Sequence, residues 1–118
     1  MRIDMKDMAK LELFFQTLAD ANRLRMIKVI GQERLSVSEI VGATGLSQPL
    51  VSHHLRVMRE QGLLETRREG PFIYHRLKEA RLLDALGLCA EIAAQSKNDK
   101  KIRRTFCCPP WMDKDNHY

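Results

Sequence analysis

The sequence predicts a mainly α-helical domain that carries one β-hairpin. Aliphatic residues and methionines recur at helical spacing over most of the chain. Only residues 65–77 have the composition of paired strands, with Glu-Gly-Pro as a turn at 69–71. A chain of 118 residues suffices for one modest core. We therefore expect one folded domain over residues 1–96 and a polar tail with a cysteine pair over 97–118.

Two helices are predicted before residue 31, over 5–18 and 21–30. Asp20 is a good N-cap for the second helix, because its carboxylate can accept from the N–H groups of the first turn. Gly31 provides the backbone freedom that ends it. The residues of the second helix that we expect to face the core are Leu24, Ile27 and Ile30.

A short helix, a turn and a longer helix are predicted between residues 36 and 61. Residues 36–39, Ser-Val-Ser-Glu, form a capping box that starts the short helix. Gly45 favours a left-handed stop, and Ser47 can cap the next helix. The proline at position 49 is tolerated in a first turn, where its missing N–H has no intrahelical partner. The pattern is a helix-turn-helix.

The second helix of this motif carries an apolar stripe and a polar stripe when its residues are placed at about 100° intervals. Val51, Leu55 and Met58 share the apolar stripe. The polar stripe offers amide, hydroxyl, imidazole and guanidinium groups, which contact base edges and phosphates in DNA complexes. An ordinary solvated face is the alternative, but the capped motif in a chain of net charge +5 favours DNA binding. The candidate DNA contacts are Ser47, Gln48, Pro49, Ser52, His53, Arg56 and Arg59.

The predicted hairpin, with strands over 65–68 and 72–77, follows this motif as a wing. Arg67 and Arg68 lie near its tip, where they would reach phosphate or the minor groove. A solvated hairpin with incidental charge is the alternative.

The last predicted helix spans residues 80–95, or extends to Arg104. Its apolar residues and those of the first helix exceed what so small a core can bury. We therefore expect a homodimer through the first and last helices, which would present two half-sites to a duplex. The two stripes consist of Met8, Leu11 and Phe15, and of Leu82, Leu86, Cys89 and Ala93.

Three segments resemble the ArsR/SmtB repressors. Residues 18–25 are similar to the entry of that family's second helix, and residues 45–55 to its recognition-helix motif. Residues 67–70, with Tyr74 and Leu77, resemble its wing. The resemblance covers residues 10–95 and implies a homodimeric winged helix-turn-helix repressor that leaves its operator DNA when an inducer binds. It also implies DNA contacts at Ser47, Gln48, Ser52 and His53.

Two inducer sites of that family are missing from this sequence. Arsenic and cadmium sensors often have Cys-x-Cys at the start of the third helix, where this chain has Ser36 and Ser38. A hydroxyl is a poor ligand for a soft ion. Zinc and nickel sensors often use histidines on the last helix, and residues 80–96 contain none.

The three cysteines are therefore the candidate sensing residues. Cys107 and Cys108 are adjacent, and two thiolates can share a soft centre such as As(III), Sb(III) or an organoarsenical, or bind Cd(II) or Zn(II). Lysines and arginines at residues 97–104 favour the thiolate. Cys89 is either a third ligand or a small core residue. Whether the site lies within or between subunits stays open, as do the inducer and the operator sequence.

Two other functions remain as alternatives. The first is a thiol-based redox or reactive-sulfur sensor of the same fold. The second is a metal carrier that does not bind DNA. An enzyme is not expected, because the chain has no nucleophile–base pairing, phosphate loop or Cys-x-x-Cys, and nothing indicates an organic cofactor. No signal peptide and no apolar run of about 20 residues occurs, so we expect a cytoplasmic protein without membrane contact.

Overall fold

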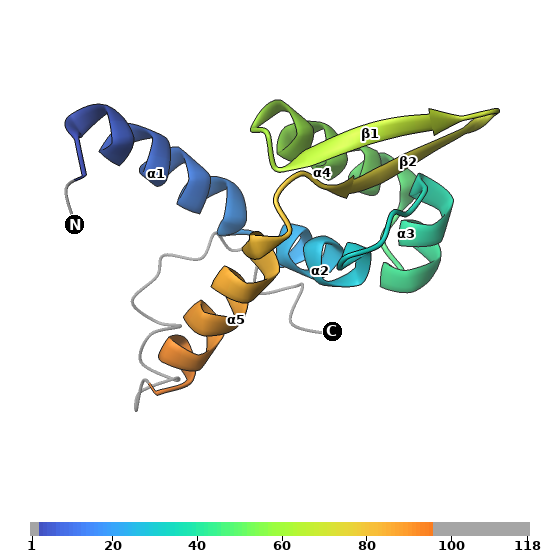
Figure 1. Ribbon diagram of the computed structural model, residues 1–118. Helices are drawn as coiled ribbons and strands as arrows, with labels where there is room; N and C mark the ends of the chain where they lie inside the picture. Colours follow the sequence, from blue (N-terminus) through green and yellow to red (C-terminus); the bar gives the residue numbers. More distant parts are fainter. Residues whose placement is uncertain (1–2, 96–118) are drawn as a thin grey trace. The chain divides into compact units, whose positions relative to one another are not determined.

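The computed structural model describes residues 3–95, which form helices and one antiparallel hairpin (Figure 1). The predicted mainly helical fold with one hairpin is confirmed. The chain divides after Asp84 into two compact units. None of the helices in the described range is long and apolar enough to cross a membrane. The elements are α1 (Met5–Leu18), α2 (Ala21–Ile30), α3 (Val37–Thr44), α4 (Gln48–Glu60), β1 (Leu64–Glu69), β2 (Phe72–Leu77) and α5 (Arg81–Ala94).

The helices begin where the sequence places caps. The Asp20 carboxylate accepts from the backbone N–H groups of Asn22 and Arg23 at the start of α2. Ser36 and Glu39 form both bonds of the capping box at the start of α3. Gly45 ends α3 at φ +73°, a left-handed conformation that glycine adopts without steric cost. Such local bonds satisfy backbone groups that a helix end leaves unpaired.

Strands β1 and β2 pair from Leu64–Leu77 at the base to Glu69–Phe72 at the tip. Gly70, at φ +61°, takes the first position of the two-residue turn, where a positive φ matches the strand twist. The predicted turn was one residue too long, because Glu69 belongs to β1. A third segment joins β2, since Leu35 and His75 exchange two backbone hydrogen bonds of 2.9 and 2.8 Å.

The core of the first unit lies among α2, α3, α4 and the hairpin. Met26, Ile27, Ile40 and Met58 have no exposed surface. Val51 and Leu55 are also buried, so the predicted apolar stripe of α4 is confirmed. This packing fixes which side of α4 faces outwards.

One core prediction in α2 was wrong. Leu24 is 40% exposed, whereas Met26, Ile27 and Ile30 are buried. Helical geometry explains the difference: Leu24 and Ile30 lie on opposite sides of Ile27, and the core is on the side of Met26 and Ile30.

The second unit contains most of α5. The helix runs one residue shorter at each end than predicted, and its proposed extension to Arg104 lies outside the described residues. Leu88 and Ile92 are about 60% exposed, at 59% and 61%. Cys89 is also exposed, so it is not a core residue of this chain.

Candidate nucleic-acid interface

Helix α4 presents a polar face to solvent. Ser47 caps the helix by accepting from the Leu50 N–H at 3.4 Å, and Pro49 lies in the first turn as predicted. The side opposite the buried stripe is exposed. The polar face, as we define it, consists of Gln48, Ser52, His53, Arg56 and Arg59, all exposed.

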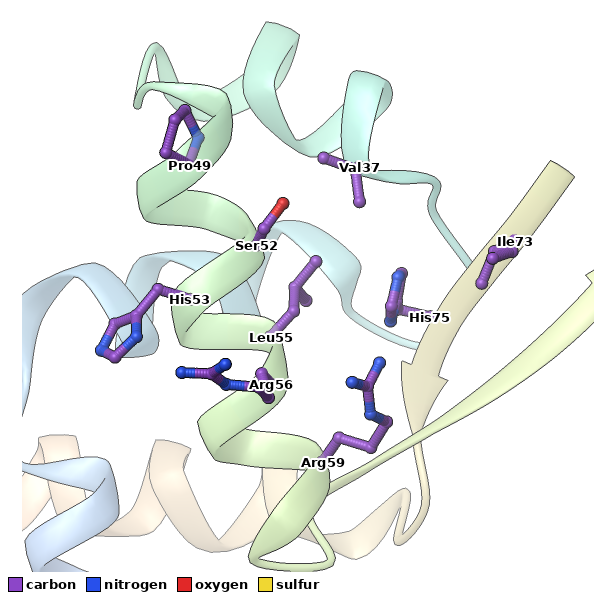
Figure 2. A pocket seen from close by; sticks show the side chains of 9 residues that line it. All are labelled: Val37, Pro49, Ser52, His53, Leu55, Arg56, Arg59, Ile73 and His75. Atoms are coloured by element: carbon purple, nitrogen blue, oxygen red, sulfur yellow. The ribbon is translucent and has the colours of Figure 1, made fainter.

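A groove of about 480 Å³ lies between α4 and the wing strand β2. Figure 2 shows Arg59 extending from α4 towards β2, with His75 projecting from the strand on the other side of the groove. Ser52 points towards Val37 at the end of the groove nearest α3, while His53 points away from the strand. The residues that line the groove are Val37, Pro49, Ser52, His53, Leu55, Arg56, Arg59, Ile73 and His75.

His75 is a groove residue that the sequence did not reveal as functional. From its place in a strand, a structural role was the expected one. It is only 4% exposed, and its buried Nδ1 has no hydrogen-bond partner. Burial lowers the pKa of His75 from its ordinary value of 6.5, and the positive charge of Arg59 lowers that pKa further. Only the arrangement of α4 and β2 brings these two basic side chains together.

A partly buried polar cluster attaches α4 to α2. The Arg23 Nε donates to His54 Nδ1 at 3.3 Å, and Arg23 Nη1 donates to the Thr17 carbonyl at 2.9 Å. Asp20 lies 3.7 Å from Arg23 Nη2. Because His54 Nδ1 accepts, the neutral ring carries its proton on Nε2, which is buried without a partner. Burial lowers the pKa of His54. The negative charge of Asp20 raises that pKa, whereas the nearby Arg23 and His53 lower it further.

The wing carries the two predicted basic residues and is connected to the segment before α3. Arg67 and Arg68 are exposed on β1, opposite Tyr74 and Ile73. Arg34 forms an ion pair with Glu69, the last residue of β1, and its guanidinium lies 4.6 Å from the centre of the Tyr74 ring. Arg34 thereby compensates the one carboxylate at the wing tip.

Of the three predicted metal ligands, the described residues include Cys89 alone. Within residues 3–95, no three histidine, cysteine, aspartate or glutamate side chains are grouped to hold a metal ion. Cys107 and Cys108 lie outside the described residues. Ser36, where the family resemblance led us to look for a cysteine, uses its hydroxyl to cap α3.

These features define a winged helix-turn-helix protein: two capped helices, the second exposed along a polar face, followed by a hairpin. The sequence of residues 20–66 matches the model of the family described as bacterial regulatory protein, arsR family.

Curated relatives agree with the match. The chain is 42% identical over 74 residues to the arsenic resistance transcriptional regulator ArsR1 of Pseudomonas putida, covering 62% of this chain and 58% of that protein. It thus spans less than two thirds of that relative. It is 32% identical over 89 residues to the arsenical resistance operon repressor of Escherichia coli, covering 70% of this chain and 76% of that repressor. This chain belongs to the ArsR/SmtB family of winged helix-turn-helix regulators.

The solved structures include a similar dimer. The homodimeric winged helix-turn-helix DNA-binding domain Mb0332 of Mycobacterium bovis aligns with a TM-score of 0.67 at 27% identity. The alignment covers 75% of this chain and 84% of that domain. The similarity in fold thus extends over most of the chain, whereas the family model covers residues 20–66.

Proposed function

We propose that this chain is a cytoplasmic transcriptional repressor that binds operator DNA as a homodimer and is released by a thiophilic metalloid. The observation that supports DNA binding best is the polar face of α4 beside the wing. Its exposed side chains are those that form hydrogen bonds with base edges and phosphates. The core holds the opposite side of α4, so this face is the one free to enter a major groove.

The charges of the interface support the same proposal. Arg56 and Arg59 on α4 and Arg67 and Arg68 on β1 lie in the two elements that would meet the duplex. Each arginine that neutralises a phosphate releases counterions, so binding should weaken as salt rises. Gln48 and Ser52, with His53, are the proposed base-reading residues because their side chains both donate and accept.

The inducer is proposed from the cysteine chemistry. Cys107 and Cys108 supply two adjacent thiolates, the donor set that suits As(III), Sb(III) or an organoarsenical. Cys89 is exposed on α5 and is available as a third ligand. Relatives named for arsenic resistance agree with this choice. Other relatives are named for cadmium and for mercury resistance, so a soft ion is the shared chemistry.

For the repressor to be released, the inducer must bind more tightly to a conformation of the dimer that cannot bind the operator. A ligand shifts such an equilibrium only by the difference in its affinity for the two states. Binding near the end of α5 would act on the dimer contacts that set the spacing of the two α4 helices. The recognition helices of such dimers must meet half-sites about one helical turn apart, so a small change in spacing weakens binding.

Gel-shift titrations with the DNA upstream of the gene test both parts of the proposal. We expect a salt-sensitive complex that As(III) or Sb(III) dissociates. Cys107→Ser with Cys108→Ser should bind the duplex normally and no longer respond. Cys89→Ser tests for a third ligand: a weaker response to As(III) than that of the wild type would assign Cys89 to the site, and an equal response would exclude it. Release of the double variant by As(III) at the wild-type concentration would contradict the metalloid site.

The DNA-binding part has its own test. Arg59→Ala should weaken duplex binding and lower the slope of log affinity against log salt by about one. Arg81→Ala is the matched control, because Arg81 is also exposed but pairs with Glu79 outside the interface. Absence of any duplex complex at low salt would contradict DNA binding itself.

A thiol redox or reactive-sulfur sensor is the second candidate. The free thiol of Cys89 favours it, because a thiol is the group that oxidants and polysulfides modify. Mass spectrometry after mild oxidant or polysulfide would distinguish the two. A cross-link between Cys89 and Cys107 or Cys108 that abolishes DNA binding, without any response to As(III), would favour this candidate.

A further inference from the structure

The groove between α4 and β2 carries a further inference, which rests on the proposed DNA binding. We propose that this groove seats one backbone phosphate of the duplex, and that His75 takes up a proton from solvent when the phosphate enters. DNA binding is then linked to pH through a residue on the wing strand, not on the recognition helix.

The position of the groove indicates a phosphate as its occupant. A recognition helix enters the major groove, and a wing beside it contacts the minor groove or backbone. The sugar–phosphate strand separates the two grooves of a duplex, so this strand must pass between α4 and β2. Arg59 and His75 face each other across that space (Figure 2).

The backbone of His75 is fixed by hydrogen bonds, whereas one nitrogen of its ring has no hydrogen-bond partner. Its backbone N–H and carbonyl are both bonded to Leu35, which fixes the residue within the wing. Its Nδ1 is buried and unpartnered, which is an uncommon state for a buried polar atom. A protonated ring would have two donors, and an anion in the groove supplies the charge that offsets the proton.

The charged surroundings of His75 come mainly from α4. That helix contributes Arg59, Arg56 and His53 to the groove. The residues that neighbouring elements place near His75 are uncharged. Thr66 of β1 pairs with His75 on one side of β2, and Leu35 pairs with it on the other. Val37 of α3 lines the same groove. Burial and Arg59 both lower the pKa of His75, and no carboxylate of residues 3–95 contributes to the shift.

The direction of the pH effect follows from these charges. In the free protein, His75 is neutral at pH 7.5, because its pKa lies below 6.5. A phosphate beside Arg59 offsets the field of that cation and attracts a proton, so DNA raises the pKa of His75. Affinity should therefore rise as pH falls from the pKa of the complex to that of the free protein. One proton gives at most about a tenfold rise per pH unit.

Fluorescence anisotropy with a random-sequence duplex at low salt tests the proposal, because a phosphate seat does not depend on operator sequence. We expect wild-type affinity to increase by about threefold or more between pH 8 and pH 6 at constant ionic strength. His75→Gln keeps a hydrogen-bonding side chain but cannot titrate, and should lose most of this increase. Circular dichroism at each pH establishes that the variant is folded.

His53→Gln is the comparison variant, because His53 is the other histidine that lines the groove. It should retain the pH dependence, whatever its effect on affinity. A pH dependence that disappears in His53→Gln and persists in His75→Gln overturns the assignment. Duplex binding that does not vary with pH overturns the proton uptake while leaving the proposed function intact. Failure to bind any duplex overturns both.

A measurement on the wild-type protein covers the case in which His75→Gln does not fold. The His75 ring Cε1–H resonance can be titrated by NMR with and without the duplex. A higher pKa in the complex supports the proposal, and an equal or lower pKa overturns it.

Discussion

At the scale of single residues, His54 and His75 share an unusual state. They are 5% and 4% exposed, and each has a buried ring nitrogen without a partner. His54 anchors α4 to α2 through Arg23, whereas His75 lines the groove opposite Arg59. Burial is the largest cause of the lowered pKa of both rings, so the fold favours the neutral form of each.

These two histidines make stability depend on pH. Because each folded-state pKa lies below 6.5, the unfolded chain binds more protons than the folded chain below that pH. The free energy of unfolding that the neutral rings contribute is therefore fully present above about pH 6.5. It declines as pH falls towards the pKa values of the folded state. Urea unfolding should give a lower midpoint at pH 5.5 than at pH 7.5. The carboxylates of Glu69 and Glu79 do not interfere, because their pKa values lie below 4.5.

The pH prediction has an internal control. His54→Gln should reduce the difference between the two midpoints, since one of the two titrating groups is removed. Equal midpoints for the wild-type protein at pH 5.5 and pH 7.5 would show that neither histidine carries the effect.

At the scale of elements, the capping box determines where α3 begins. Ser36 accepts from the Glu39 N–H at 3.3 Å, and the Glu39 carboxylate accepts from the Ser36 N–H at the same distance. We expect Ser36→Ala to lower the free energy of unfolding by about 1 kcal/mol. Ser38→Ala is the matched control, because Ser38 is exposed in the same helix and makes no side-chain hydrogen bond. Denaturant unfolding measures both, and an equal loss would rule out the cap as the cause.

The wing is a second element that depends on one side chain. Arg34 reaches both Glu69 and the Tyr74 ring from outside the hairpin. We expect Arg34→Ala to speed amide hydrogen exchange in β1 and β2 and to weaken duplex binding, because Glu69 would then repel phosphates. Arg81→Ala breaks a comparable exposed ion pair with Glu79 and should change neither. Unchanged exchange in Arg34→Ala would show that the hairpin holds its position without this contact.

At the scale of the whole molecule, large apolar side chains remain exposed on α1 and on α5. Phe15 is 51% exposed, and Leu88 and Ile92 are 59% and 61% exposed. Full burial of a large apolar side chain is worth about 1.5–3 kcal/mol, so covering these half-exposed residues would stabilise an assembly by about half of that for each. A homodimer through these two helices, as proposed, would bury them.

Analytical ultracentrifugation tests the dimer. Phe15→Glu and Ile92→Glu should each shift the protein towards the monomer and weaken operator binding. Phe72→Glu is the control for the oligomeric state alone, because Phe72 is 57% exposed but lies at the tip of the wing. Loss of the dimer in the control variant alone would place the interface on the wing instead.

Local sequence patterns specify the helices and the hairpin of this protein. Caps at Asp20, Ser36 and Ser47 act within a single helical turn, so each start could be predicted from neighbouring residues. Hydrophobic spacing likewise predicted the buried side of α4. The arsR-family match confirmed what the recognition-helix motif had indicated. The roles of the three cysteines stay predictions, and those of Cys107 and Cys108 come from sequence chemistry alone.

Contacts between residues that are distant in the sequence arise only when the elements pack together. Arg34 and Glu69 are 35 positions apart, and Arg23 and His54 are 31 apart. No local pattern specifies such pairs, because they depend on how the helices and the hairpin pack. The same packing left Leu24 exposed, although its spacing fits a core residue. It also placed His75 against Arg59, which made a strand residue part of the candidate DNA interface.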